Sequence, residues 1–254
     1  MQTSFKPSSF RSALLVAVSF AAILTLVLAS TTLAEPPANS LVFRATDKPF
    51  GKSYTQWSEE WWQWALALPV EGHPFSEPFT NDDCNSGQRA PVWFLGISVL
   101  EDPLVERSCN IPANMAVFIG LPNVECDSRT PDFPPDFGGQ TASVQRKCAK
   151  FYADHIDVDT LFCELDGDPV TNDLRSFRFR SSQFTFVAPT PWIFGTKGGP
   201  GTAVSDGYYV MLKPLSKGNH TLRCGGAFHL SVAEGDPFDA DFGFGNTYHL
   251  TVEE

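Results

Sequence analysis

The chain has 254 residues and a formal net charge of −11 at pH 7, with 18 Lys and Arg against 29 Asp and Glu. This acidic balance argues against nucleic acid and anionic membranes as partners, because both carry negative charge. It leaves divalent cations as candidate ligands. Phe, Pro and Gly are abundant, at 22, 20 and 19 residues, which indicates short strands separated by turns.

The N-terminal segment has the features of a secretory signal. Lys6 and Arg11 precede an uninterrupted apolar run over residues 13–29, ALLVAVSFAAILTLVLA. Thr32 and Ala34 then supply small residues at the −3 and −1 positions of a cleavage site. A basic start, an apolar centre and small residues at the cut predict export.

We therefore expect residues 1–34 to be a signal peptide and residues 35–254 to form one mature domain. Removal of the segment takes away two positive charges and no negative one, so the net charge changes from −11 to −13. The mature chain is then secreted or periplasmic, without stable insertion into a membrane. The alternative is an N-terminal membrane anchor, although the apolar run is shorter than the about 20 residues of a spanning helix.

All six cysteines lie in the predicted mature chain. None has the C-x-x-C or C-x-x-H spacing of a zinc site. An even number of cysteines in an oxidising compartment indicates disulfides, which removes the most reactive side chains from the catalytic candidates. The sequence alone leaves the pairing open; we expect Cys84–Cys109, Cys126–Cys148 and Cys163–Cys224, the last joining two strands.

One helix is predicted early in the chain, over about residues 53–68. Trp57, Trp61, Trp64 and Leu68 are spaced so that they share one helical face. A Ser or Thr at the start can cap this helix, and the Pro that follows it ends it. A second helix is predicted over residues 143–156, where apolar residues recur at intervals of three to four.

The rest of the chain predicts strands and turns. We expect long loops over residues 70–90 and 123–140. Alternating or continuous apolar runs predict strands over residues 91–100, 114–122, 158–167, 177–188, 207–215, 220–232 and 246–254. This pattern predicts a mainly β fold, namely an antiparallel β-sandwich of the jelly-roll or Ig-like type with the Trp-rich helix packed on it.

Three motifs resemble a family of exported bacterial proteins of unassigned function. They are W-S-x-x-W-W-Q-W-A-L-x-L-P at 57–69, G-Q-x-x-P-V-W-F-L-G at 87–96 and S-D-G-Y-Y-V-M-L-x-P-L from Ser205. The resemblance extends over most of the mature chain. It implies export and a β-rich fold, and it transfers no catalytic residue.

Aromatic and imidazole side chains are the first candidates for binding. Trp62 lies about 100° from Trp61 around a helix, so it is a candidate platform for a sugar or a peptide. The alternative is that it covers an edge of the core. His229 and His249 occupy matching positions in FHLSV and YHLTV, and both are expected to point outward. If these strands pair in register, the two imidazoles can share a metal or a ligand.

Clustered acids suggest a cation site. Asp236, Asp239 and Asp241 lie in a Gly-rich segment between the last two predicted strands. Carboxylates in such a loop are typical ligands of extracellular calcium, although the spacing does not match an EF-hand. The alternative is that these residues only stabilise turns, which Asp does through its own backbone contacts.

No motif assigns a reaction. The sequence lacks the G-x-S-x-G elbow of serine hydrolases, and no pair of carboxylates is singled out. We therefore favour a non-catalytic binding module for an extracellular glycan or protein partner. Two alternatives remain open: a metal-assisted hydrolase of an extracellular polymer, and a structural or surface-assembly protein.

Overall fold

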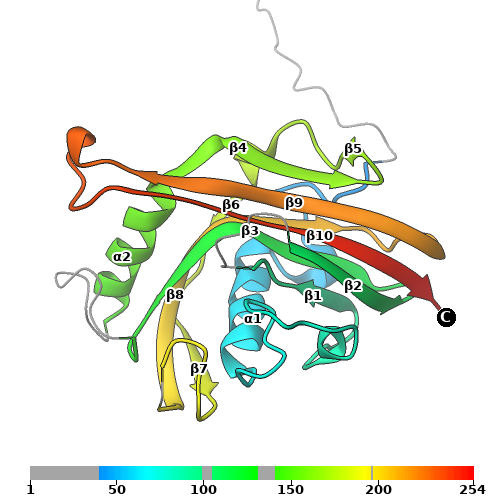
Figure 1. The fold of residues 1–254 in the computed structure, drawn as a ribbon, viewed down its shortest axis with the longest axis horizontal. Coiled ribbons are helices and arrows are strands. Elements are labelled where there is room, and N and C mark those ends of the chain that lie inside the picture. Colours follow the sequence, from blue (N-terminus) through cyan, green and yellow to red (C-terminus); the bar gives the residue numbers. More distant parts are fainter. Residues whose placement is uncertain (1–39, 99–104, 131–140, 196) are drawn as a thin grey trace, which may run out of the picture. The chain divides into compact units, whose positions relative to one another are not determined.

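The structure, a computed structural model, describes residues 40–98, 105–130, 141–195 and 197–254 (Figure 1). The predicted signal peptide over residues 1–34 lies outside the described residues, as do parts of the predicted loop over 123–140 and the end of the predicted strand over 91–100. The described residues belong to one compact unit, Pro37–Glu254. They include no helix that is both long and apolar enough to cross a membrane.

The described part of the chain is mainly β, with two mixed sheets and two α-helices. The helices are α1, Tyr54–Ala67, and α2, Ala142–Asp154. The strands are β1 Val92–Leu95, β2 Val105–Pro112, β3 Ala116–Asp127, β4 Ile156–Leu165, β5 Asp168–Pro169, β6 Arg178–Arg180, β7 Phe184–Ala188, β8 Gly199–Leu212, β9 Gly218–Leu230 and β10 Ala240–Glu253.

Each sheet has five strands. Sheet A has the order β1-β3-β8-β6, and β7 also pairs with β8; sheet B has the order β2-β10-β9-β4-β5. Most neighbours are antiparallel, as expected, but β1–β3 and β2–β10 are parallel pairs. The prediction of a purely antiparallel fold is therefore corrected. The sequence does not predict strand β2, because its charged and polar residues give it little apolar character.

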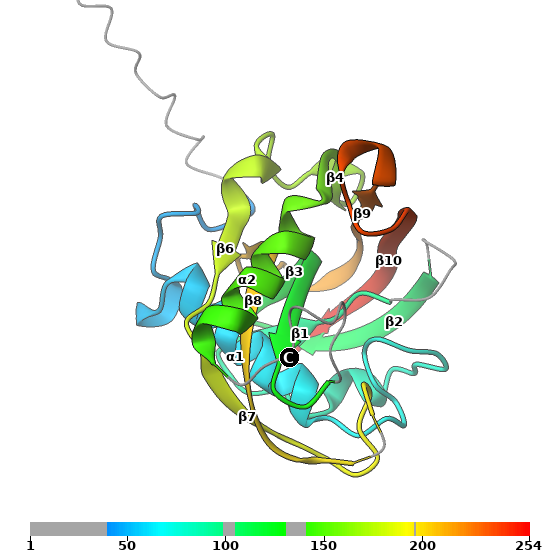
Figure 2. The same cartoon turned by 90° about the vertical axis from the view of Figure 1, so that its left-hand side faces the viewer.

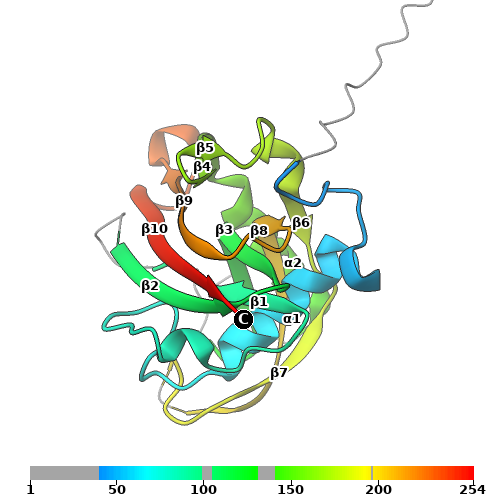
Figure 3. The ribbon, with the colours of Figure 1, turned by 90° about the vertical axis from the view of Figure 1, so that its right-hand side faces the viewer.

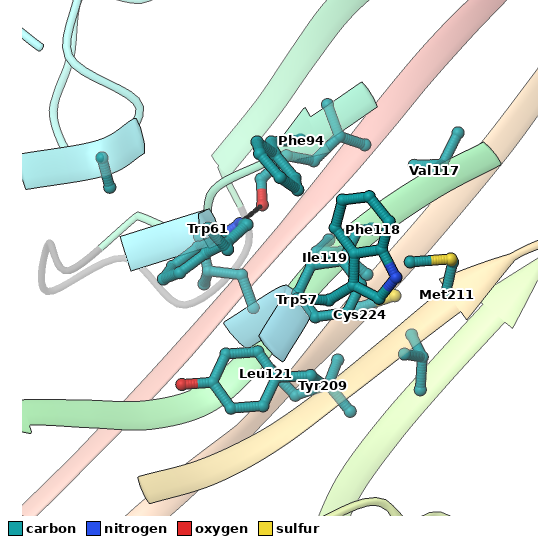
Figure 4. Packing of buried hydrophobic residues seen from close by; sticks show 14 of the residues in the cluster. Trp57, Trp61, Phe94, Val117, Phe118, Ile119, Leu121, Tyr209, Met211 and Cys224 are labelled. Carbon is teal, nitrogen blue, oxygen red and sulfur yellow. Dashed lines mark hydrogen bonds between the residues drawn. The ribbon is translucent and has the colours of Figure 1, made fainter. Parts of the chain in front are cut away.

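Helix α1 forms where the tryptophan spacing predicts it. Ser53 caps the helix: its hydroxyl accepts the backbone N–H of Gln56, while the Gln56 side chain accepts the backbone N–H of Ser53. The helix packs on one face of sheet A, where Trp57 and Trp61 lie among the buried side chains around Phe118 (Figure 4). The rings of Tyr54 and Phe118 lie 6.1 Å apart. Trp61 is almost fully buried, and its indole packs above Gly120 of β3.

The other face of sheet A is covered by two elements. Strand β3 packs against β9 of sheet B (Figure 3). Pro122 of β3 lies close to Gly226 of β9. Helix α2 packs against β3 and β8 and is tied to β3 by the disulfide Cys126–Cys148 (Figure 2). Sheet A is thus a central layer, and its far end, formed by β7 and the start of β8, extends past sheet B.

The six cysteines form the three disulfides that the sequence predicts, and no described cysteine is free. Cys163 and Cys224 are direct partners in the pairing of β4 with β9, so this disulfide does join two strands. Three disulfides in one domain fit folding in an oxidising, non-cytoplasmic compartment.

Candidate functional site

The four tryptophans of α1 are structural. Each indole N–H donates to a different segment of the chain: Trp57 to Pro49 O, Trp61 to Leu95 O, Trp62 to Tyr209 Oη and Trp64 to Ser86 O, at 2.8–3.1 Å. Trp62 is 5% exposed, so it offers no ring face to a ligand. Its expected role as a surface platform is corrected: three of the four rings are buried, because loops as well as sheet A surround α1.

The two candidate histidines lie far apart. His229 pairs with Asp241 across β9 and β10, whereas His249 pairs with Thr221 near the other end of the same ribbon. Eight residues of strand, about 26 Å, separate the two positions. Both side chains point outward and are half exposed, as the alternation predicts. A site shared by the two imidazoles does not form.

The three candidate metal ligands do not converge either. Asp236 accepts hydrogen bonds from the backbone N–H of Ser231 and from His155, and Asp239 accepts the N–H of Val232. Asp241 lies in β10 rather than in a loop. Across the described ranges, no group of three or more His, Cys, Asp and Glu side chains can hold a metal ion. The positions of Asp236, Asp239 and Asp241 therefore do not support the predicted calcium site.

Asp241 instead pairs with a histidine. Its carboxylate contacts His229 Nδ1 at 2.5 Å, and this hydrogen bond raises the pKa of His229. The two side chains are exposed, at 50% for His229 and 79% for Asp241, so water screens the pair. The arrangement is typical of a surface ion pair that joins two strands.

Ser216, His220 and Asp166 resemble a catalytic triad in their order of contacts. Ser216 Oγ lies 3.2 Å from His220 Nε2, and His220 Nδ1 lies 2.7 Å from Asp166 Oδ2. However, Nε2 is closer to the Ser216 carbonyl oxygen, at 2.9 Å. Both ring nitrogens thus face acceptors, and both must donate. An imidazole in this state cannot take the proton of the serine hydroxyl, so the set lacks a general base.

Two carboxyl groups lie at the end of β3, on the partly buried Glu125 and the buried Asp127. Burial raises the pKa of Glu125 well above its usual range, and the neighbouring Asp127 raises it further. Asp127 accepts the backbone N–H groups of Arg129, at 2.5 Å, and of Thr130, at 2.8 Å, and also the Thr130 hydroxyl. A carboxyl group whose pKa is raised by burial is a candidate general acid. Glu125 Oε2 is closed off from solvent, however, so a substrate cannot reach it.

An open groove lies at the far end of sheet A. It encloses about 530 Å³, within the range of ligand sites. Thr185 and Val187 of β7 are exposed along it, and Phe186 between them is buried, as strand alternation requires. The lining residues are Ser128, Arg129, Thr185, Phe186, Val187, Pro200, Gly201 and Thr202.

Arg129 shapes this groove. Its guanidinium donates to three carbonyl oxygens of the β7–β8 hairpin, those of Lys197, Gly198 and Pro200, at 2.5–3.0 Å. Gly201 is required beneath it, because a Cβ there would lie 2.6 Å from the Phe186 ring and 3.0 Å from Arg129 Cδ. The groove thus combines hydroxyls, apolar side chains and one cation, with no acid or imidazole.

The sequence does not single out the groove. Arg129 falls in a predicted loop, and β8 begins at Gly199, eight residues before the strand predicted over residues 207–215. The available signal is the density of glycines beside the alternating strand FTFVA. Such glycines indicate that another side chain approaches the backbone closely.

Comparisons of the chain with protein-family models, with curated proteins and with solved structures find no match. The resemblance of its motifs to exported bacterial proteins therefore stays a prediction.

Proposed function

We propose that the chain is an exported, disulfide-bonded binding protein without a catalytic role, and that the groove at the end of sheet A receives its extracellular partner. The observation that carries this proposal is the composition of the groove. Its lining offers hydroxyl donors and acceptors, exposed apolar surface and one guanidinium, but no Asp, Glu, His or Cys. Such a surface can hold a ligand, whereas proton transfer, or attack by one of its hydroxyls, needs a neighbouring base that the lining lacks.

The disulfides support export, to the periplasm or to the outside of the cell. The packing of β3 against β9 supports the description of the two sheets as a β-sandwich. The parallel pairs β1–β3 and β2–β10 set this arrangement apart from an Ig-like domain or a jelly roll built only from antiparallel neighbours.

A protein partner fits the groove better than a glycan. Sugar rings are commonly held against exposed aromatic faces, and the one aromatic residue in the lining, Phe186, is 5% exposed. Val187, in contrast, is 66% exposed, the highest value of any large apolar side chain in the described chain. Apolar side chains are buried at the core of a protein interface, so Val187 offers a contact point to a protein partner.

The test uses two matched variants. Val187→Asp places a charge in the groove, and Val232→Asp places the same charge at a second exposed valine, 54% exposed, in the β9–β10 turn. The oxidised chain and both variants are screened against a glycan array and a displayed peptide library. We expect the unchanged chain and Val232→Asp to retain the same ligands and Val187→Asp to lose them. A ligand that Val187→Asp binds equally well, or the absence of any ligand, contradicts the proposal.

A further inference from the structure

Strand β7 has one paired edge and one open edge. Within the described residues, β7 pairs only with β8, from Phe184 opposite Ala203 to Ala188 opposite Gly199. In an antiparallel pair, successive residues direct their backbone N–H and C=O groups alternately toward the partner and away from it. The identity of the residues that point away decides whether the open edge can bind another strand.

Val187 points its backbone groups away from β8. Its partner is Pro200, which has no N–H. Two residues of a hydrogen-bonded antiparallel pair exchange two N–H···O=C bonds, and Pro200 cannot donate one of them. The pair Val187–Pro200 is therefore of the non-hydrogen-bonded kind, so the N–H and C=O of Val187 face the open edge.

Thr185, two residues earlier, shows the same orientation by independent contacts. Its partner Thr202 directs its backbone away from β7, toward Ser128 just after β3: Thr202 N donates to Ser128 Oγ and Thr202 O accepts from Ser128 N, both at 2.9 Å. On the open side, Thr185 O accepts the side-chain amide of Gln63 at 2.9 Å. The side-chain amide of Gln63 in α1 thus binds the outward-facing carbonyl of Thr185, as the N–H of an added strand would. An added strand can do the same at Val187.

The charge around this edge selects the partner. Arg129 contacts the carbonyl of Pro200, the residue opposite Val187, and Lys197 lies exposed in the hairpin. Among the described residues, neither of these two cations forms an ion pair, whereas Arg107, Arg178 and Arg180 each contact a carboxylate. On a chain with a net charge of −11, the open edge of β7 therefore lies near two cations that have no ion-pair partner among the described residues.

We propose that β7 binds an extended acidic peptide segment of a partner protein, which pairs with Val187, beyond the Thr185 carbonyl that Gln63 occupies, and adds a strand to sheet A. This inference rests on the proposed binding function and names the partner of the same groove. Backbone hydrogen bonds at Val187 supply the affinity, and Arg129 and Lys197 select acidic side chains. A second copy of the chain is the poorer occupant, because two molecules of charge −11 repel each other.

The decisive variant is Val187→Pro. Because the Val187 N–H makes no bond to β8, proline removes no ladder hydrogen bond and is tolerated on an edge strand. It does remove the donor that an added strand needs. Val187→Thr retains the donor and is the matched control. We expect the thermal midpoints of both variants to remain close to that of the unchanged chain.

The probe is a displayed library of randomised peptides of about eight residues, selected on the oxidised chain. We expect enrichment of acidic, β-branched peptides whose affinity falls at least about tenfold with Val187→Pro, changes little with Val187→Thr and weakens with Lys197→Glu or added salt. Synthetic peptides methylated at single amide nitrogens then test the pairing. Methylation of the N–H that pairs with Val187 must abolish binding, whereas methylation of either neighbouring N–H must not, because neighbouring N–H groups of a strand point away from β7.

Three outcomes overturn the inference: no enriched peptide, peptides that Val187→Pro binds normally, or insensitivity to amide methylation. A large loss of stability in Val187→Pro overturns the assigned backbone orientation. Enriched peptides without acidic residues overturn the assignment of charge. A glycan that binds the unchanged chain but not Val187→Asp retains the proposed function and removes the peptide partner, so the two failures are distinguishable.

Discussion

The indole N–H of Trp62 donates to the phenol oxygen of Tyr209 at 2.9 Å, in the interior between α1 and sheet A. Tyr209 in turn donates to Asn123 Oδ1 at 3.2 Å. Burial raises the pKa of Tyr209, so its hydroxyl stays protonated and can donate and accept at the same time. The contact links the helix, β8 and β3, and it is the physical reason why a tryptophan that looks like a surface platform is a core residue.

Trp62→Phe is expected to lower the free energy of unfolding by about 2 kcal/mol, because it removes one buried hydrogen bond and part of a buried ring. Tyr209→Phe removes the acceptor of the same bond. The double variant should lose less stability than the two single variants lose together, because both remove the same hydrogen bond. Urea unfolding of the unchanged chain, the two single variants and the double variant measures this coupling. Trp64→Phe, at a less buried ring, is the control. A Trp62→Phe chain of unchanged stability contradicts the structural role.

Glu125→Gln is expected to stabilise the chain at neutral pH. A carboxyl group in the unfolded chain releases its proton near pH 4.5, whereas burial raises the pKa of Glu125 well above this value. The folded state then holds more protons than the unfolded state, so stability falls as the pH rises from 4.5 through the raised pKa. The amide introduced by Glu125→Gln does not titrate and should flatten this slope. Glu253→Gln, at an exposed residue, should leave it unchanged; equal slopes in the two variants contradict the prediction.

Much of the fold follows from local sequence signals, but the register of the strands does not. The spacing of Trp57, Trp61 and Trp64 predicts α1 because a helix repeats every 3.6 residues. Strand β2 escapes prediction because its pairing with β10, not its own residues, makes it a strand. Local patterns report which face of an element is buried, and they do not report which element is its neighbour.

The candidate sites failed for the same reason. Pairing His229 with His249 requires a hairpin centred on Asp239, whereas the observed pairing of His229 with Asp241 is centred on Gly235. Gly235 adopts φ 104°, a conformation that glycine favours, so the turn forms there. A shift of four residues in the turn changes every cross-strand partner. The groove, likewise, depends on long-range contacts of Arg129 that no local pattern encodes.

Ser216 is predicted not to act as a nucleophile. A fluorophosphonate probe should leave it unlabelled, and Ser216→Ala should change no hydrolytic activity, because both nitrogens of His220 donate to acceptors. Peptide mass spectrometry of the treated chain makes the measurement. A labelled Ser216, with labelling lost in His220→Asn, would show that the imidazole can serve as a base.

The pair formed by His220 and Asp166 should contribute stability within a window of pH. Partial burial lowers the pKa of His220, but the hydrogen bond to Asp166 outweighs this effect and raises the pKa above 6.5. This contribution is complete below pH 6.5 and is lost as the pH rises through the raised pKa. Partial burial raises the pKa of Asp166, but the hydrogen bonds from His220 and Thr221 outweigh this effect and lower the pKa below 3.8. The stability that Asp166 contributes is therefore lost as the pH falls through this lowered pKa.

His220→Asn is therefore expected to cost stability near pH 6 and little near pH 10, as thermal unfolding across this range would record. His249→Asn is the control, since its nearest carboxylate oxygen, on Glu106, is 3.6 Å away. An equal cost of His220→Asn at both pH values contradicts the assigned charge.

Loss of a disulfide should destabilise the chain strongly and to different extents. Cys163 and Cys224 close the longest loop, at a sequence separation of 61, while Cys126 and Cys148 close the shortest, at 22. A cross-link restricts the unfolded chain more when its loop is longer, so we expect replacement of both cysteines by alanine to cost about 4 kcal/mol for the first pair and about 3.5 kcal/mol for the second. Urea unfolding without reductant measures both. Because Cys126–Cys148 also ties α2 to β3, its loss should expose the amides of α2 to hydrogen exchange first. Protection of α2 that survives this change would show that packing alone holds the helix on sheet A.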